Sequence, residues 1–269
     1  MNEVRAAKLS GAGNDFVAVD AAERQRLGEC FPDWVRAVCR RGVSIGADGV
    51  LVVDVNTSEV GVEFYNPDAS RAFCGNGTRC AARFASRAGA GDTPTLRTDV
   101  GRVETRVTDL DVTLWLPFRP QATARRVESE GTSFDGWDVD AGCPHYVIET
   151  DSVARAPLTE WGPRLRCHPD FGPEGRNVDV WSRDTDHVRV RTWERGVEGE
   201  TLACGSGAIA AAEVLRVCDP AKAEEGWTLL PASGVPLVVA FPDDGRTRLT
   251  GDARLLWEGR VASGASEGL

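Results

Sequence analysis

The chain has 269 residues, of which 42% are hydrophobic and 27% are charged, and its formal net charge is −10. This composition is typical of a soluble globular protein with about two domains and excludes a largely disordered chain. The acidic balance argues against a general binder of nucleic acids or acidic membranes, because either needs a basic surface. Apolar runs such as 49–53 are too short to span a bilayer, and the N-terminal residues lack the apolar core of a secretory signal. We therefore expect a cytoplasmic protein.

Short β-rich segments separated by glycine dominate the first half. Apolar patterning predicts strands at 5–9, 16–20, 50–55, 60–65, 103–107 and 112–116. It also predicts helices at 32–41, with Pro32 in the first turn, and at 75–87. Pro117 and Pro120 mark a break, and we interpret the polar stretch 121–135 as a connection or an edge element.

The second half repeats this organisation. Strands are predicted at 146–149, 177–180, 188–193, 228–230, 237–241 and 254–257, with a long helix at 205–217. In both halves a strand, a polar loop, a Cys-Gly-x-Gly turn and a helix follow one another. This self-similarity predicts two related α+β domains that face each other across a cleft.

The two glycine turns carry the chemistry that the sequence suggests. Cys74 and Cys204 open the turns Cys-Gly-Asn-Gly and Cys-Gly-Ser-Gly, and each turn leads into an alanine-rich helix. A helix N-terminus favours a thiolate and offers backbone N–H groups to a carboxylate. If the two turns hold one amino acid, one thiolate can remove its α-proton while the other thiol protonates the opposite face. The matched pair therefore predicts inversion of a stereocentre without a cofactor.

The eight cysteines allow other interpretations. In a cytoplasmic chain they are better read as free thiols than as a disulfide framework. A zinc site is not expected, because there is no Cys-x-x-Cys pair and the three histidines are scattered. The stretch 11–13 alone is too incomplete a glycine pattern to predict a dinucleotide site.

Longer motifs resemble the diaminopimelate epimerase family, whose members are pyridoxal-independent amino-acid epimerases. The resemblance covers essentially the whole chain, and its motifs occur in order at 11–16, 46–49, 65–68, 74–80, 142–145 and 194–207. It implies an α+β fold of two pseudo-symmetric domains, each a mixed sheet curled round a central helix, with the active site in the cleft between them. The expected halves are 1–118, with Cys74, and 119–269, with Cys204, and the last strand at about 254–260 is expected to return to the N-terminal half.

The resemblance also implies roles for individual residues. The acid/base residues would be Cys74 and Cys204, with His145 and Glu194 near the reacting centre to orient the substrate amine or tune the thiols. The reacting carboxylate would be held by Gly75, Asn76, Gly205 and Ser206. The rest of the substrate would be recognised by Asn14, Asn66, Asn177 and Arg195, with Arg195 on the distal carboxylate. Several of these have a purely structural alternative, since asparagine in a turn often bonds only local backbone.

The chain departs from the family pattern near the expected substrate pocket. Cys143 stands where the family usually has asparagine, and cysteine is a much weaker hydrogen-bond partner. The segment 66–74 is one residue shorter than usual, and Ala69 replaces a customary glycine. These changes leave the thiol pair intact but leave open whether diaminopimelate is the only substrate.

The predicted function is cofactor-independent epimerisation of LL-diaminopimelate to meso-diaminopimelate, in lysine and peptidoglycan precursor synthesis. A racemase of the same fold that acts on another amino acid is the first alternative. A thiol redox protein with a Cys74–Cys204 disulfide is less favoured, and a non-catalytic binding module does not need both thiols. The expected partner is a small amino-acid substrate, with no nucleic acid, membrane, metal or cofactor, and a homodimer is left open.

Overall fold

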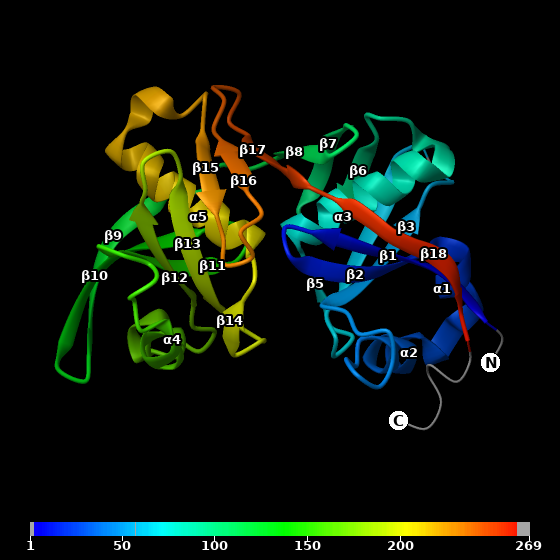
Figure 1. The fold of residues 1–269 in the computed structure, drawn as a ribbon, viewed down its shortest axis with the longest axis horizontal. Helices are drawn as coiled ribbons and strands as arrows, with labels where there is room; N and C mark the ends of the chain where they lie inside the picture. The colour runs from blue at the N-terminus through cyan, green and yellow to red at the C-terminus, as the bar shows by residue number, and fades with distance from the viewer. Residues whose placement is uncertain (1–2, 57, 263–269) are drawn as a thin grey trace. The chain divides into compact units, whose positions relative to one another are not determined.

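The chain forms two compact units, which we call the N-terminal unit and the C-terminal unit. The computed structural model describes residues 3–56 and 58–262 (Figure 1). The N-terminal unit comprises Met1–Trp115 and Gly251–Leu269, and the C-terminal unit comprises Leu116–Thr250. Each unit contains a mixed sheet and helices, so the predicted α+β class is confirmed.

The sheet of the N-terminal unit curls round one helix. Its strands, in the order in which they pair, are β18 (Arg254–Val261), β1 (Val4–Gly11), β2 (Asn14–Asp20), β3 (Gly49–Asp54), β4 (Val60–Tyr65), β6 (Thr95–Thr98), β7 (Gly101–Val107) and β8 (Asp111–Leu116). The short strand β5 (Arg71–Ala72) pairs with β4. Helix α3 (Gly75–Ala85) packs against β1, β2, β3, β4, β7 and β18. Helices α1 (Ala21–Leu27) and α2 (Phe31–Val38) bury Leu27, Phe31 and Trp34 in a separate apolar cluster.

The C-terminal unit repeats this order of pairing. Its strands are β9 (Ala122–Ser129), β10 (Thr132–Asp140), β11 (Pro144–Glu149), β12 (Asn177–Arg183), β13 (Val188–Glu194), β15 (Trp227–Leu230) and β16 (Leu237–Ala240), with β14 (Gly199–Thr201) on β13 and β17 (Thr247–Asp252) later in the chain. The pairs β11–β12 and β13–β15 are parallel, as β2–β3 and β4–β6 are in the N-terminal unit. Helix α5 (Gly205–Cys218) packs against β9 to β13, β15 and β16, and α4 (Leu158–Arg166) packs against β12 to β14.

Small side chains allow each central helix to be enclosed by strands. In α5 the residues from Gly207 to Leu215 are all buried, and four of these nine are alanine. A helix that is apolar on every side is stable only when it is surrounded by the rest of its unit. The N-terminus of such a helix is consequently held in one place by packing, which fixes the turn that precedes it.

Parts of the predicted secondary structure were incomplete or wrong. Of the two interpretations of 121–135, a connection or an edge element, the first was wrong, because the stretch forms most of the hairpin β9–β10. The helix predicted at 32–41 ends at Val38, and α1, α4, β5, β6, β14 and β17 were not predicted. Helix α4 contains Gly162 and Pro163, which oppose helix formation locally, but Leu158 and Leu165 are completely buried. Tertiary packing therefore overrides the local signal. No helix among the described residues is long and apolar enough to cross a membrane.

Ala69 adopts a left-handed backbone conformation, with φ of 71°. Its N–H donates to Asn66 O at 2.8 Å and the Asn66 N–H donates to Ser70 O at 2.9 Å, so Ala69 lies in a closed turn.

We expect Ala69→Gly to raise the free energy of unfolding by about 0.5–1 kcal/mol, because relief of Cβ strain outweighs the greater flexibility of unfolded glycine. Urea denaturation measures this change. Ala22→Gly on the exposed face of α1 is the control and should instead lower stability by about 1 kcal/mol; an equal loss in both variants would contradict the prediction.

Candidate functional site

In the N-terminal unit, Cys74 caps helix α3 as the sequence predicted. Its backbone is extended, with φ of −137° and ψ of 112°, and its Sγ accepts a hydrogen bond from the Gly77 N–H at 3.3 Å. The Cys74 carbonyl accepts from the N–H and from the hydroxyl of Thr78, both at 2.8 Å. Cysteine thus takes the position at which serine or aspartate usually caps a helix, and its sulfur lies among the first-turn N–H groups.

A buried polar network holds two of the predicted substrate-binding residues. Asn76 Nδ2 donates to Asn14 Oδ1 at 2.6 Å, and Asn14 Nδ2 donates to Asp48 Oδ2 at 3.0 Å. Arg79, which is fully buried, donates to Asn76 Oδ1 at 2.9 Å and to the Asp252 carbonyl at 3.3 Å. The amide orientations of both asparagines are thereby fixed next to the Cys74 turn. Asn66 instead bonds within its own turn, where its Nδ2 donates to Ser70 Oγ at 3.0 Å.

In the C-terminal unit, Cys204 caps helix α5 in the same way. Its φ and ψ are −120° and 113°, and its Sγ accepts from the Gly207 N–H at 3.3 Å. Ser206 Oγ lies 3.3 Å from the same sulfur. The two cysteine turns therefore have the same local geometry in two units of the same topology.

His145 joins the Cys204 turn to a buried carboxylate. Its Nδ1 lies 2.6 Å from Asp179 Oδ2 and its Nε2 lies 3.0 Å from Ser206 Oγ, and both His145 and Asp179 are fully buried. The Thr192 hydroxyl donates to the other Asp179 oxygen at 2.6 Å. Burial lowers the pKa of His145, but the negative charges of Asp179 and Cys143, together with the hydrogen bonds to both, outweigh burial and raise that pKa well above its usual value. His145 is thus held as an imidazolium that can donate toward Ser206.

Asn177 and Arg195 reach this cluster in different ways. Asn177 Oδ1 accepts from the Arg195 backbone N–H at 2.7 Å, which turns Asn177 Nδ2 toward Cys143 Sγ at 3.4 Å and His145 Nε2 at 3.3 Å. The Arg195 guanidinium lies 3.4 Å from the exposed Glu174 carboxylate. This single contact leaves other guanidinium N–H groups for the distal substrate carboxylate that the resemblance implies.

Glu194 and Cys204 influence each other. Glu194 is half-buried and accepts from the Thr201 hydroxyl, and burial raises its pKa. Burial, followed by the charges of Glu194 and Asp179, raises the pKa of Cys204 well above its usual value. The expectation that the helix N-terminus favours a thiolate was therefore wrong for Cys204. Desolvation and neighbouring carboxylates outweigh the helix dipole there, and the residue rests as a thiol.

Sequence reasoning missed Asp179 and Thr192, and it identified Cys143 only as a departure from the family pattern near the substrate pocket. Asp179 follows Asn177 by two residues on β12, so strand alternation places both on one face and could have identified it. Thr192 is the cross-strand partner of Asp179 on β13, a register that only the folded sheet shows.

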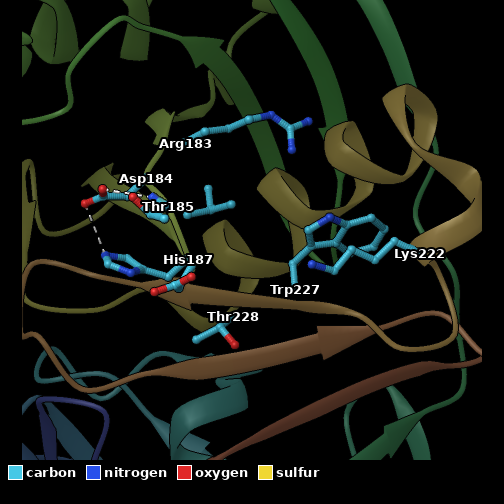
Figure 2. Close-up of a pocket in the computed structure, with 9 residues that line it drawn as sticks. Arg183, Asp184, Thr185, His187, Lys222, Trp227 and Thr228 are labelled. Carbon is cyan, nitrogen blue, oxygen red and sulfur yellow. Dashed lines mark hydrogen bonds and ion pairs between the residues drawn. The ribbon is translucent and has the colours of Figure 1, made fainter.

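A separate pocket of about 290 Å³ lies in the C-terminal unit and contains none of the predicted site residues (Figure 2). It is lined by Arg183, Asp184, Thr185, Asp186, His187, Val188, Lys222, Trp227 and Thr228. Asp184 Oδ2 lies 3.5 Å from His187 Nε2 and 3.2 Å from Arg189 Nε. Neither this pocket nor any other group of three or more His, Cys, Asp or Glu residues in 3–56 and 58–262 is arranged to hold a metal ion.

The charge state of His145 can be tested directly. Because Asp179 raises its pKa, the charged form persists to higher pH than in an ordinary histidine, and we expect its ring to titrate with a midpoint above about 6.5. The chain has three histidines, so ring carbon shifts in NMR spectra can be assigned by substitution. Asp179→Asn should lower the midpoint. Asp170→Asn, which removes the carboxylate 3.8 Å from His168, is the control and should leave it unchanged; an unshifted His145 in Asp179→Asn would contradict the assignment.

Comparison with known proteins identifies the family. The family model described as diaminopimelate epimerase matches residues 6–114 and 138–256. A diaminopimelate epimerase of Aquifex aeolicus is 35% identical over 95% of this chain and 96% of its own, and one of Methanocella arvoryzae is 32% identical over 97% and 98%.

Among solved structures, a probable proline racemase of Agrobacterium radiobacter aligns with a TM-score of 0.73 at 16% identity, covering 97% of this chain and 93% of its own. A hydroxyproline epimerase of Agrobacterium vitis aligns with the same TM-score and identity over 100% and 96%. At this identity the solved structures establish the fold alone, whereas the sequence matches span nearly all of this chain and of the relatives. The chain therefore belongs to the diaminopimelate epimerase family.

Proposed function

We propose that this protein epimerises LL-diaminopimelate to meso-diaminopimelate without a cofactor, with Cys74 and Cys204 as its acid/base pair. The observation that carries the proposal is the equivalence of the two cysteine turns, each capping the central helix of its own unit. Membership of the family and the names of its relatives support the choice of substrate.

The proposed reaction moves two protons and no net electrons. A thiolate removes the α-proton, and the electron pair of the broken C–H bond is delocalised into the neighbouring carboxylate. The opposing thiol then protonates the other face of the α-carbon, so the two sulfurs exchange protonation states in each turnover. Burial, followed by the charges of Glu194 and Asp179, raises the pKa of Cys204, which supports Cys204 as the protonated thiol of the pair in the ligand-free protein.

The groups around each thiol have distinct proposed tasks. Backbone N–H groups at the starts of α3 and α5, with Asn76 and Ser206, stabilise the negative charge that develops on the reacting carboxylate. The pair of His145 and Asp179 positions the Ser206 hydroxyl next to the Cys204 sulfur. Burial and the negative charge of Glu194 keep Cys204 protonated until a base removes the substrate proton. The remaining recognition residues in the proposal are Asn14, Asn66, Asn177 and Arg195.

A reducing compartment suits this chemistry, because both thiols must stay unoxidised. No disulfide forms among the cysteines that the structure describes, and free thiols of this number are typical of cytosolic proteins. We accordingly place the activity in the cytoplasm.

The test is hydrogen exchange in D₂O followed by proton NMR. The protein is incubated with LL- or meso-diaminopimelate and no added cofactor. We expect deuterium at the α-carbon and appearance of the other stereoisomer. Lysine and other amino acids with one α-centre serve as comparison substrates. Exchange only with these would replace the proposal by a racemase of the same fold, and exchange with neither would refute it.

A further inference from the structure

Cys143, in the C-terminal unit, is a thiol that takes no part in the proposed reaction. Cys143 Sγ lies 3.3 Å from His145 Nε2, and His145 Nδ1 lies 2.6 Å from Asp179 Oδ2. Asn177 Nδ2 donates to the same sulfur at 3.4 Å. A cysteine, a histidine and a buried carboxylate are thus connected in series, an arrangement that activates sulfur as a nucleophile.

The charges in this cluster favour a Cys143 thiolate. Burial raises the pKa of Cys143, but the positive charge of His145 and the hydrogen bonds to His145 and Ser206 outweigh burial and lower that pKa. Cys143 is half-buried rather than enclosed, so a small reagent can reach it. The buried Cys39 and Cys80 lie in the opposite situation, because burial raises the pKa of Cys39 to about 12 and that of Cys80 further.

A second thiol is within reach of the first. Ser206 Oγ lies 3.2 Å from Cys143 Sγ and 3.3 Å from Cys204 Sγ, so the two sulfurs contact the same hydroxyl. Their separation cannot exceed the sum of these two distances, and rotation of the side chains can shorten it. Both sulfurs belong to the same unit, in the loop before β11 and at the N-terminus of α5.

We propose that Cys143 is a modification site for hydroperoxides and that its oxidation ends in a disulfide with Cys204. The Cys143 thiolate attacks a peroxide oxygen, the S–O bond forms, and the O–O bond breaks with hydroxide or alkoxide as the leaving group. The Cys204 sulfur then attacks the Cys143 sulfur, the S–S bond forms, and the hydroxyl leaves with the Cys204 proton as water. Two thiols lose two electrons, and one hydroperoxide gains them.

The first step prepares the second. The negative charge of Cys143 is one of the causes of the raised pKa of Cys204. Conversion of the thiolate to a neutral sulfenic acid removes that charge, so Cys204 gives up its proton more readily when its partner has been oxidised. If the proposed function holds, the disulfide consumes one of the two acid/base thiols and stops epimerisation until a thiol reductant restores it.

Tryptic peptides make the product unambiguous. Cleavage after arginine leaves Cys143 as the only cysteine of 127–155, Cys204 as the only one of 196–216, and Cys74 as the only one of 72–79. Full-length protein is treated with hydrogen peroxide, alkylated and digested without reduction. Mass spectrometry should find 127–155 joined to 196–216, both in the wild type and in Cys74→Ser. The masses are read without an activity assay, so the result does not depend on the proposed function.

Variants separate the steps. In Cys204→Ser, a sulfenic-acid trap such as dimedone should label Cys143 on the order of ten-fold faster than the exposed Cys30 and Cys218. His145→Gln should remove this difference, and Cys218→Ser should leave cross-linking unchanged. Circular dichroism confirms that each variant is folded. The proposal is overturned if Cys143 in Cys204→Ser reacts no faster than the exposed cysteines, or if peroxide joins 72–79 to 196–216 and leaves 127–155 unlinked.

Discussion

Cys74→Ala and Cys204→Ala are each expected to lower the rate of epimerisation at least about 10³-fold. Inversion needs a base on one face of the α-carbon and an acid on the other, so neither thiol can replace its counterpart. Both sulfurs cap a central helix and accept a hydrogen bond at 3.3 Å from the N–H three residues later, which positions them alike. The measurement is formation of the second stereoisomer of diaminopimelate, followed by NMR in D₂O.

The same experiment separates the two thiols. Each variant should retain slow deuterium exchange at substrate centres of one configuration only, and the retained configuration should differ between the variants. Cys218→Ala, at the other end of α5, is the control and should retain wild-type rates. Epimerisation near the wild-type rate in either Cys74→Ala or Cys204→Ala would refute the two-thiol mechanism.

Gly207→Ala is expected to lower the free energy of unfolding by about 2–4 kcal/mol and to reduce activity at least about ten-fold. A Cβ at position 207 would lie 2.7 Å from Thr192 Oγ1 and closer still to Asp179 Oδ1. These two oxygens are buried and hydrogen-bonded to each other. Neither can move away from the new Cβ without disturbing the Asp179 carboxylate that holds His145. Chemical denaturation and the epimerisation assay measure the two effects.

Gly77→Ala is the matched control, because Gly77 is the equivalent residue of the turn in the N-terminal unit. Its added Cβ would lie 3.2 Å from Leu51 Cδ2 and 3.4 Å from Cys74 Cβ. The Leu51 methyl can move slightly, and alanine favours the helix over glycine by about 1 kcal/mol, so the net change should be below about 1 kcal/mol. Equal losses in the two variants would show that the Asp179 network does not set the requirement for glycine.

Local patterns predicted most of the elements that carry the site. Strand β4 was predicted with its observed bounds, and α3 and α5 were predicted to begin at the glycine turns, where they do begin. These signals depend on residues a few positions apart, namely the period of apolar side chains and a capping residue before a glycine. Helix α4 was missed for the same reason, because Gly162 and Pro163 act locally against a helix that burial stabilises.

The sequence by itself determined the class of the fold, the internal repeat, the family resemblance and the pair of cysteine turns. Each of these is recognised from short motifs whose own residues lie close together in the chain. Only the tertiary structure decided the protonation state of Cys204 and which residues surround it. Parallel pairing of β11 with β12 sets His145 beside Asn177, and antiparallel pairing of β12 with β13 sets Asp179 beside Thr192. Burial, followed by the charges of Glu194 and Asp179, raises the pKa of Cys204, whereas the charge of His145 and the hydrogen bonds to His145 and Ser206 outweigh burial and lower the pKa of Cys143. Electrostatic effects of this kind depend on distance and burial in space, which strand register and packing establish and the order of residues does not show.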